Sequence, residues 1–105
     1  MSEQEPKQIK KNNIPKNVIF IGKKPFMNYV NAAQIQLKEN ETIEICARGK
    51  SISRAVDISE VLEKKFMKDQ IEKVEIITDS ESFDSKEKEG KKINVSTIKI
   101  VLKRK

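Results

Sequence analysis

The sequence predicts a two-layer α/β sandwich: a mixed four-stranded sheet, two helices and the element order βαβαββ. Two β-branched apolar runs are each followed by a segment whose apolar residues recur at helical spacing, which is typical of strand–helix–strand units. Two further apolar runs follow with no helical pattern between them. The strand–helix–strand units favour parallel pairing through right-handed crossovers, and the last two strands favour an antiparallel hairpin. At 105 residues the chain is sized for one domain with a single core.

The first strand and the first helix are expected on either side of a short loop. Residues 17–21 are apolar without alternation, which predicts a strand buried on both faces. Gly22 ends the strand, and Pro25 suits the first turn of the helix because its missing N–H leaves no bond unmade. The helix continues to about Lys38 on one apolar stripe: Phe26, Val30, Ala33 and Leu37.

The second strand is expected at residues 42–47, followed by the second helix. Alternate side chains of this strand share one face: Ile43, Ile45 and Ala47. Ser51 or Ser53 can cap the helix by accepting hydrogen bonds from its free backbone N–H groups. The apolar positions of the helix are Ile52, Ala55, Val56, Ile58, Val61, Leu62 and Phe66.

The third and fourth strands are expected at residues 73–78 and 94–103. The fourth alternates so that one face carries Ile98, Ile100 and Leu102. Residues 79–93 between them are rich in Ser, Asp, Glu and Lys, and they far exceed a usual hairpin loop of about two to five residues. This segment is expected either to extend from the body as a two-stranded hairpin arm turning near Glu89 and Gly90, or to remain disordered.

The composition narrows the classes of function. The net charge is +6 and the pI is about 9.4, which favours nucleic acid or an anionic membrane surface as partner. There is no histidine, so the commonest general base and the commonest metal ligand are missing. The lone Cys46 cannot form an internal disulfide or a cysteine metal cage and is expected to pack in a strand. We predict no catalytic residue, no metal site and no cofactor.

The amino-terminal residues 1–16 are polar and charged, with little to bury, and predict a flexible tail ahead of a domain at residues 17–105. They lack the apolar core of a signal peptide, and no apolar run approaches the length of a membrane span. We therefore expect a cytoplasmic protein with no membrane association.

Basic residues gather where each of the first two strands gives way to a helix. A helix N-terminus carries unsatisfied N–H groups and about half a positive charge, so cations placed there favour anions. Parallel strands put both junctions at one edge of the sheet. The candidate phosphate-binding residues are Lys23 and Lys24 at the first junction, and Arg48, Gly49, Lys50, Ser51 and Arg54 at the second.

For several of these residues, a purely structural role stays open beside phosphate binding. Lys23 and Lys24 could be solvated loop lysines. Gly49 could let the backbone approach a phosphate or simply permit a turn with positive φ. Tyr29 and Phe66 are more typical of core or interface residues than of platforms for stacked bases.

The two junction motifs resemble those of the Alba family, small basic chromatin and RNA-binding proteins found widely in archaea. The resemblance covers about residues 17–105. It rests on Ile21-Gly22-Lys23-Lys24-Pro25, Met27-Asn28-Tyr29-Val30, Ala47-Arg48-Gly49-Lys50-Ser51-Ile52-Ser53-Arg54-Ala55-Val56-Asp57, Phe66, and Val95-Ser96-Thr97-Ile98-Lys99-Ile100.

The resemblance implies a fold similar to the C-terminal domain of a bacterial translation initiation factor. It also implies homodimers that lay a basic body along duplex nucleic acid and reach outward with paired arms. Lys23 and Lys24 would face phosphate, and Lys23 would match a lysine whose acetylation weakens DNA binding. Arg48, Lys50 and Arg54 would add backbone contacts, while Asn28 and Tyr29 would lie near the same surface and support the loop more than read bases. Phe66 would match a position that joins neighbouring dimers along DNA.

The arm departs from the family pattern because its charge sums to −1. It carries Asp79, Glu81, Asp84, Glu87 and Glu89 against Lys86, Lys88, Lys91 and Lys92. Carboxylates in an arm repel phosphate, so only Lys91 and Lys92 are carried over as arm contacts. Binding weaker or more selective than that of abundant coating proteins is the expected result.

The sequence thus predicts a non-catalytic protein that binds double-stranded DNA, and also RNA, largely through phosphates and helps organise the chromosome. The partner would be a second copy or a paralogue. One alternative is an RNA-binding subunit of an RNA-processing complex. Another is an enzyme acting on phosphate esters with Asp57, Glu60 and Glu63, although these acids lie on one helix with no partnered nucleophile.

Overall fold

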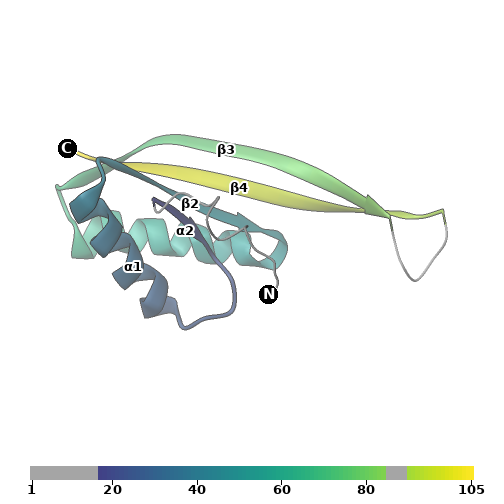
Figure 1. The fold of residues 1–105 in the computed structure, drawn as a ribbon, viewed down its shortest axis with the longest axis horizontal. Helices are drawn as coiled ribbons and strands as arrows, with labels where there is room; N and C mark the ends of the chain where they lie inside the picture. The colour runs from purple at the N-terminus through teal and green to yellow at the C-terminus, as the bar shows by residue number, and fades with distance from the viewer. Residues whose placement is uncertain (1–16, 85–89) are drawn as a thin grey trace.

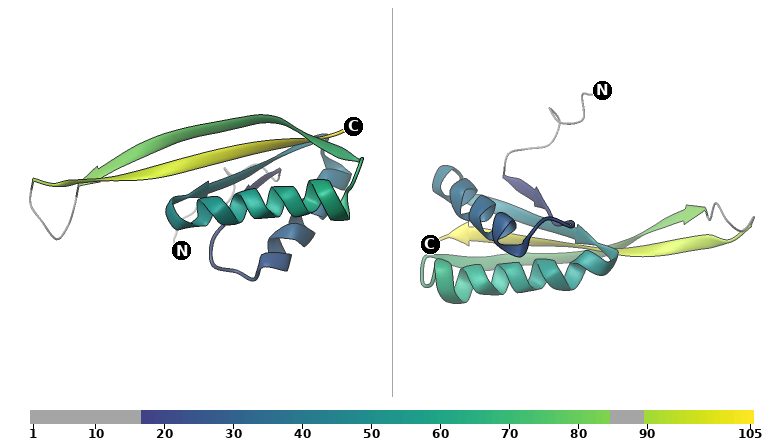
Figure 2. Two further views of the ribbon diagram at one scale, coloured as in Figure 1. Left: turned by 180° about the vertical axis from the view of Figure 1, so that it is seen from behind. Right: turned by 90° about the horizontal axis from the view of Figure 1, so that it is seen from below.

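The computed structural model describes residues 17–84 and 90–105, so the predicted tail at 1–16 and the predicted turn at Glu89 lie outside the described residues. Two helices cover one face of a four-stranded sheet, and a long two-stranded ribbon extends beyond the body (Figures 1 and 2). The strands are β1 (Val18–Phe20), β2 (Thr42–Arg48), β3 (Ile71–Asp84) and β4 (Lys92–Arg104). None of the described helices is long and apolar enough to cross a membrane.

The strand order is β1-β2-β4-β3, with β1 parallel to β2 and β4 antiparallel to both of its neighbours. The predicted pairing of the second strand–helix–strand unit is wrong in one respect, because β4 lies between β2 and β3. A central strand needs an apolar face against the helices. β4 supplies three buried side chains there, Ile98, Ile100 and Leu102, whereas Ile71 is the only buried residue of β3.

Helix α1 (Phe26–Glu39) buries the predicted stripe, because Val30, Ala33 and Leu37 are fully enclosed. Pro25 takes the N-cap position, immediately before the helix, and its carbonyl accepts a hydrogen bond from the Asn28 N–H at 3.0 Å. The proline thus starts the helix through its fixed φ of −56°.

Strand β1 is not buried on both faces, contrary to the prediction. Ile19 and Ile21 point toward the helices and are buried, but Phe20 is 59% exposed on the opposite face. The reason is that both helices pack on the same side of the sheet, so nothing in the described chain covers the other side. The apolar run of β1 therefore has one side chain that belongs to a surface.

The second helical segment has three parts: a 3-10 turn (Gly49–Ser51), α2 (Ile52–Val61) and a π-helical turn (Leu62–Phe66). Of the two serines predicted to cap α2, Ser51 takes the N-cap position and Ser53 lies inside the helix, but the Ser51 side chain makes no cap hydrogen bond. A backbone hydrogen bond, from the Ile52 N–H to the Gly49 carbonyl, closes the turn before α2 instead. Of the predicted apolar positions, Val56 and Phe66 are exposed and the three fully buried ones are Ala55, Ile58 and Leu62.

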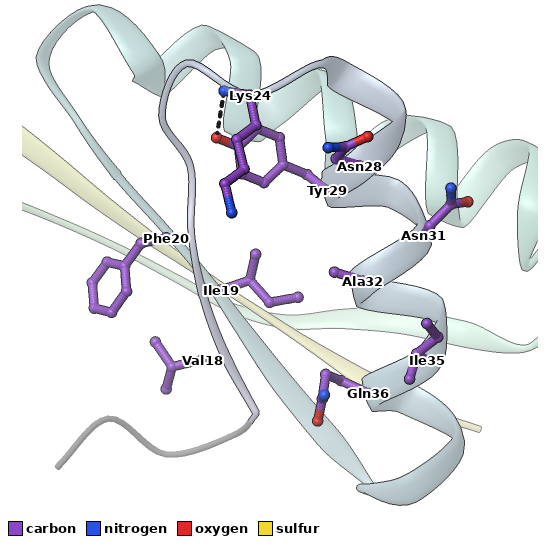
Figure 3. A pocket seen from close by; sticks show the side chains of 10 residues that line it. All are labelled: Val18, Ile19, Phe20, Lys24, Asn28, Tyr29, Asn31, Ala32, Ile35 and Gln36. Carbon is purple, nitrogen blue, oxygen red and sulfur yellow. Dashed lines mark hydrogen bonds between the residues drawn. The ribbon is translucent and has the colours of Figure 1, made fainter. Parts of the chain in front are cut away.

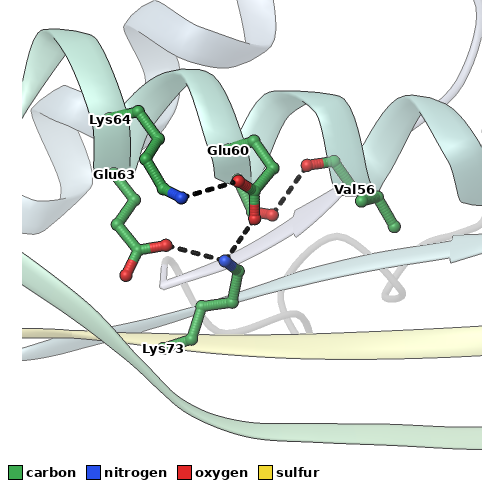
Figure 4. A network of polar contacts seen from close by, with 6 residues as sticks. Val56, Glu60, Glu63, Lys64 and Lys73 are labelled. Atoms are coloured by element: carbon green, nitrogen blue, oxygen red, sulfur yellow. Dashed lines mark hydrogen bonds and ion pairs between the residues drawn. The ribbon is translucent and has the colours of Figure 1, made fainter.

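An ion-pair network ties the end of the second helical segment to the start of β3 (Figure 4). The ammonium of Lys73 contacts the carboxylates of Glu60 and Glu63, and the Glu63 contact is 2.7 Å. A β-bulge between Lys73 and Glu75 follows directly. The hydrogen bond from Lys73 lowers the pKa of Glu60. Burial lowers the pKa of Lys73, but hydrogen bonds to both carboxylates outweigh it and raise that pKa overall.

Replacing Lys73 with Met is expected to lower the melting temperature at pH 7. The folded-state pKa of Glu60 lies below its ordinary value of 4.5, so its contribution is present above that pH and is lost as the pH falls through the folded pKa. The difference in melting temperature between the variant and the wild type should therefore be smaller at pH 3 than at pH 7. Circular-dichroism melts would measure it, with the exposed Lys65→Met as control. An equal loss at both pH values would contradict an ionic role.

Candidate nucleic-acid interface

The two basic junctions lie side by side at one edge of the sheet, as the parallel pairing of β1 and β2 requires. A direct contact joins them. The guanidinium of Arg54, in the first turn of α2, donates a 2.9 Å hydrogen bond to the carbonyl of Gly22 in the β1–α1 loop. Arg54 is half-buried and lies 32 residues from its acceptor. It links the two junctions through this bond, and its role as a phosphate contact stays a prediction.

Tyr29 fixes the shape of the first junction. Its hydroxyl accepts hydrogen bonds from the backbone N–H groups of Gly22, at 2.8 Å, and of Lys24, at 3.0 Å. Its ring is buried and lies under the Arg54 guanidinium, 5.7 Å from ring centre to Cζ. The family resemblance implied that Tyr29 supports the loop, and these contacts show how it does so from the first turn of α1.

The contacts of Tyr29 change how the first junction can hold an anion. Two of the loop amides point at the tyrosine oxygen, so they are not available as phosphate donors. The side chains of Lys23 and Lys24 are exposed, and neither makes an ion pair with another described residue. An anion at this junction would therefore meet the two ammonium groups and not these two backbone amides.

A depression of about 580 Å³ lies next to this junction, between β1 and α1 (Figure 3). Lys24 lines its upper end, and Phe20, Ala32 and Ile35 line its sides. Asn28 also borders it, but the amide groups of Asn28 and of its neighbour Asn31 point away from β1 in this view. Asn28 thus borders the same depression as Lys24, and its role in binding stays a prediction.

The second junction presents Arg48, Gly49 and Lys50 to solvent, with Ser51 half-buried behind them. Gly49 has a φ of +57°, so the turn requires a residue that tolerates the left-handed region. Of the two interpretations left open for this glycine, the turn conformation is the one the structure shows. Lys50 makes no ion pair within the described part of the chain.

The hairpin arm extends as a ribbon, with pairing that runs from Ile71 opposite Arg104 to Asp84 opposite Lys92. Of the two alternatives for residues 79–93, the described part therefore forms an arm (Figure 2). Lys91 and Lys92 lie near its tip, away from both junctions, and Lys92 pairs with Asp84 at 3.4 Å. The charges at residues 86–89 fall outside the described residues.

The base of the arm holds Arg48. Its Nη1 lies 3.4 Å from the Glu81 carboxylate, and its Cζ lies 5.4 Å from the centre of the Phe83 ring. Neither partner was found from the sequence. Glu81 and Phe83 are two apart in a strand and so share a face, but the periodicity gives no sign of which residue that face would meet.

The remaining predicted residues lie apart from this edge. Phe66 is 45% exposed at the far end of the second helical segment. Cys46 is half-buried on the uncovered face of the sheet, and burial raises the pKa of its thiol. Among residues 17–84 and 90–105, no group of His, Cys, Asp or Glu side chains could hold a metal ion.

A family model described as Alba matches residues 17–81. The chain belongs to the Alba family. It is 48% identical over 90 residues to a DNA/RNA-binding protein Alba of Methanocella arvoryzae, an alignment that covers 84% of this chain and 90% of the relative. It is 51% identical over 90 residues to a DNA/RNA-binding protein Alba of Picrophilus torridus, an alignment that covers 84% of this chain and 96% of that relative.

Solved structures of Alba proteins confirm the predicted fold class. Alba from Thermoplasma volcanium superposes with a TM-score of 0.73 at 45% identity, covering 84% of this chain and all of that one. ALBA1 from Trypanosoma brucei superposes with a TM-score of 0.69 at 20% identity, covering 88% of this chain and 72% of that one. This second likeness shows that the Alba fold persists where most of the sequence has changed.

Changing Tyr29 to Phe is expected to destabilise the protein by about 1–3 kcal/mol, because two loop amides lose their acceptor. Urea unfolding would measure the free energy, and hydrogen exchange would report the amides of Gly22 and Lys24 directly. Asn28→Ala, one position away and exposed, serves as control. Unchanged exchange protection at the two amides would refute the assigned role.

Proposed function

We propose that this protein binds double-stranded DNA, and RNA, without catalysis and largely through phosphates, and that it contributes to chromosome organisation. The observation that carries the proposal is the edge where Arg54 joins two basic junctions into one surface. The names of the relatives, DNA/RNA-binding protein Alba, support the same ligand class. The phosphate-binding set consists of Lys23, Lys24, Lys50 and Arg48, with Asn28, Gly49, Ser51 and Arg54 shaping the surface.

The mechanism is electrostatic. Exposed ammonium groups displace condensed counterions from the nucleic-acid backbone, which lowers the free energy of the complex by an amount that falls with salt. The side chains on this edge are suited to phosphate oxygens, and they carry little information about base sequence. Lys91 and Lys92 would add contacts from the arm where it follows a groove. Acetylation of Lys23 would remove one of the exposed charges.

Replacing Lys23 and Lys24 together with Ala is expected to weaken binding to all duplex sequences alike. The slope of log K against log salt should flatten by up to about 1.8, because each neutralised phosphate contributes about 0.9. Fluorescence anisotropy with a DNA duplex and an RNA duplex, over a matched series of salt concentrations, would measure the affinity and the slope. Lys38→Ala with Lys105→Ala removes the same charge from exposed positions outside the junctions. A slope equal to that of wild type would remove the lysines from the interface.

The proposal includes a homodimer, or a heterodimer with a paralogue. Exposed apolar side chains gather on the edge strand β3, where Val74 is 49%, Ile76 55% and Ile77 41% exposed. Val56 of α2 is also exposed, at 38%. An unpaired edge strand with apolar side chains is a surface that proteins normally cover. Phe66, at the end of the second helical segment, would contact a neighbouring dimer.

Changing Ile76 to Asp is expected to convert a dimer of about twice 12.1 kDa into a monomer, since a charge would be buried without a partner. Light scattering with size-exclusion chromatography would give the mass. Ile35→Asp is the matched control, because Ile35 is 53% exposed on α1. A monomeric wild type, or a dimer that survives the change at Ile76 alone, would count against this surface.

A further inference from the structure

Arg48 is a predicted phosphate-binding residue, yet its charge is already engaged by the arm. The Glu81 carboxylate lies 3.4 Å from Nη1, and the Phe83 ring lies under the guanidinium at 5.4 Å. Strand pairing brings these residues together, because Arg48 pairs with Thr97 on β4 and Thr97 pairs with Asp79 on β3. The strand pairing therefore places the base of the arm beside the end of β2.

The surroundings of Arg48 are acidic on the arm side. Asp79 and Glu81 line the same hollow as Arg48 on the uncovered face of the sheet, a space of about 430 Å³. A carboxylate offers a guanidinium the same kind of acceptor oxygens as a phosphate does. Glu81 thus occupies a position that a backbone phosphate would take, and it also repels a phosphate that approaches.

We propose that Glu81 competes with nucleic-acid phosphate for Arg48, so that the arm of this protein limits the affinity of its own basic edge. This inference rests on the proposed function and deepens it. Phe83 keeps the guanidinium against the arm, and Glu81 supplies the competing charge. Binding of nucleic acid then requires the Arg48–Glu81 pair to open or to tolerate a phosphate beside it.

The exposure of the pair sets the size of the effect. The side chains of Arg48 and Glu81 are 62% and 51% exposed, and exposed ion pairs are weak because water screens them. Such a contact modulates binding and does not block it. Removing the Glu81 charge is therefore expected to tighten binding by about two- to five-fold at low salt.

The test is a double-mutant cycle on duplex binding. Glu81→Gln should raise the affinity for the duplex about two- to five-fold at low salt. It should also steepen the slope of log K against log salt by about 0.9, because one more cation becomes available to phosphate. Glu75→Gln is the control, because it removes an equal charge from β3 at an exposed position that has no ion pair with a described residue. In an Arg48→Ala background, Glu81→Gln should gain no more than Glu75→Gln does.

The outcomes separate this inference from the proposed function. A wild type that binds with a steep salt slope, while Glu81→Gln and Glu75→Gln behave alike, overturns the competition and leaves the proposed function standing. An equal gain from Glu81→Gln with and without Arg48 overturns it as well, because the effect would then be general repulsion. A wild type that binds no nucleic acid overturns both. Circular-dichroism melts of each variant exclude unfolding as the cause.

Discussion

The basic edge of this protein depends on one small cluster, in which Tyr29 and Arg54 hold Gly22 from two sides. The tyrosine hydroxyl accepts the loop amides, and the arginine donates to the loop carbonyl from the next helix. Polar groups buried in a loop must be paired, so this cluster gives the loop one conformation. Without it, the lysines of the first junction would have no fixed position relative to those of the second.

The second constraint is that both helices cover the same face of the sheet. The covered face holds the core, and the other face keeps Phe20, Arg48 and Ile77 accessible to solvent. The long strands β3 and β4 continue past the helices, so their outer parts have no core to join (Figure 1). One-sided coverage thus produces both the arm and the apolar edge from which we infer a dimer.

Charge is distributed unevenly over these two parts. The junctions offer exposed cations, whereas the described arm places Asp79 and Glu81 next to one of them. An Alba protein built in this way has a basic body opposed by its own arm. The net charge of +6 already counts these acids, so the attraction that a nucleic acid meets at the basic edge depends on where the charges lie as well as on their sum.

The sequence by itself determined the elements, the alternation of β2 and β4, the junctions and the family, because periodicity and motif spacing are local properties of the chain. The Alba fold class followed from these, and the comparisons confirm it. The tertiary structure alone decided that β4 lies between β2 and β3, that Phe20 is exposed, and that Arg54 and Arg48 turn to Gly22 and Glu81. These contacts join residues 32 and 33 positions apart, so they depend on the path of the chain through space, which local patterns do not record.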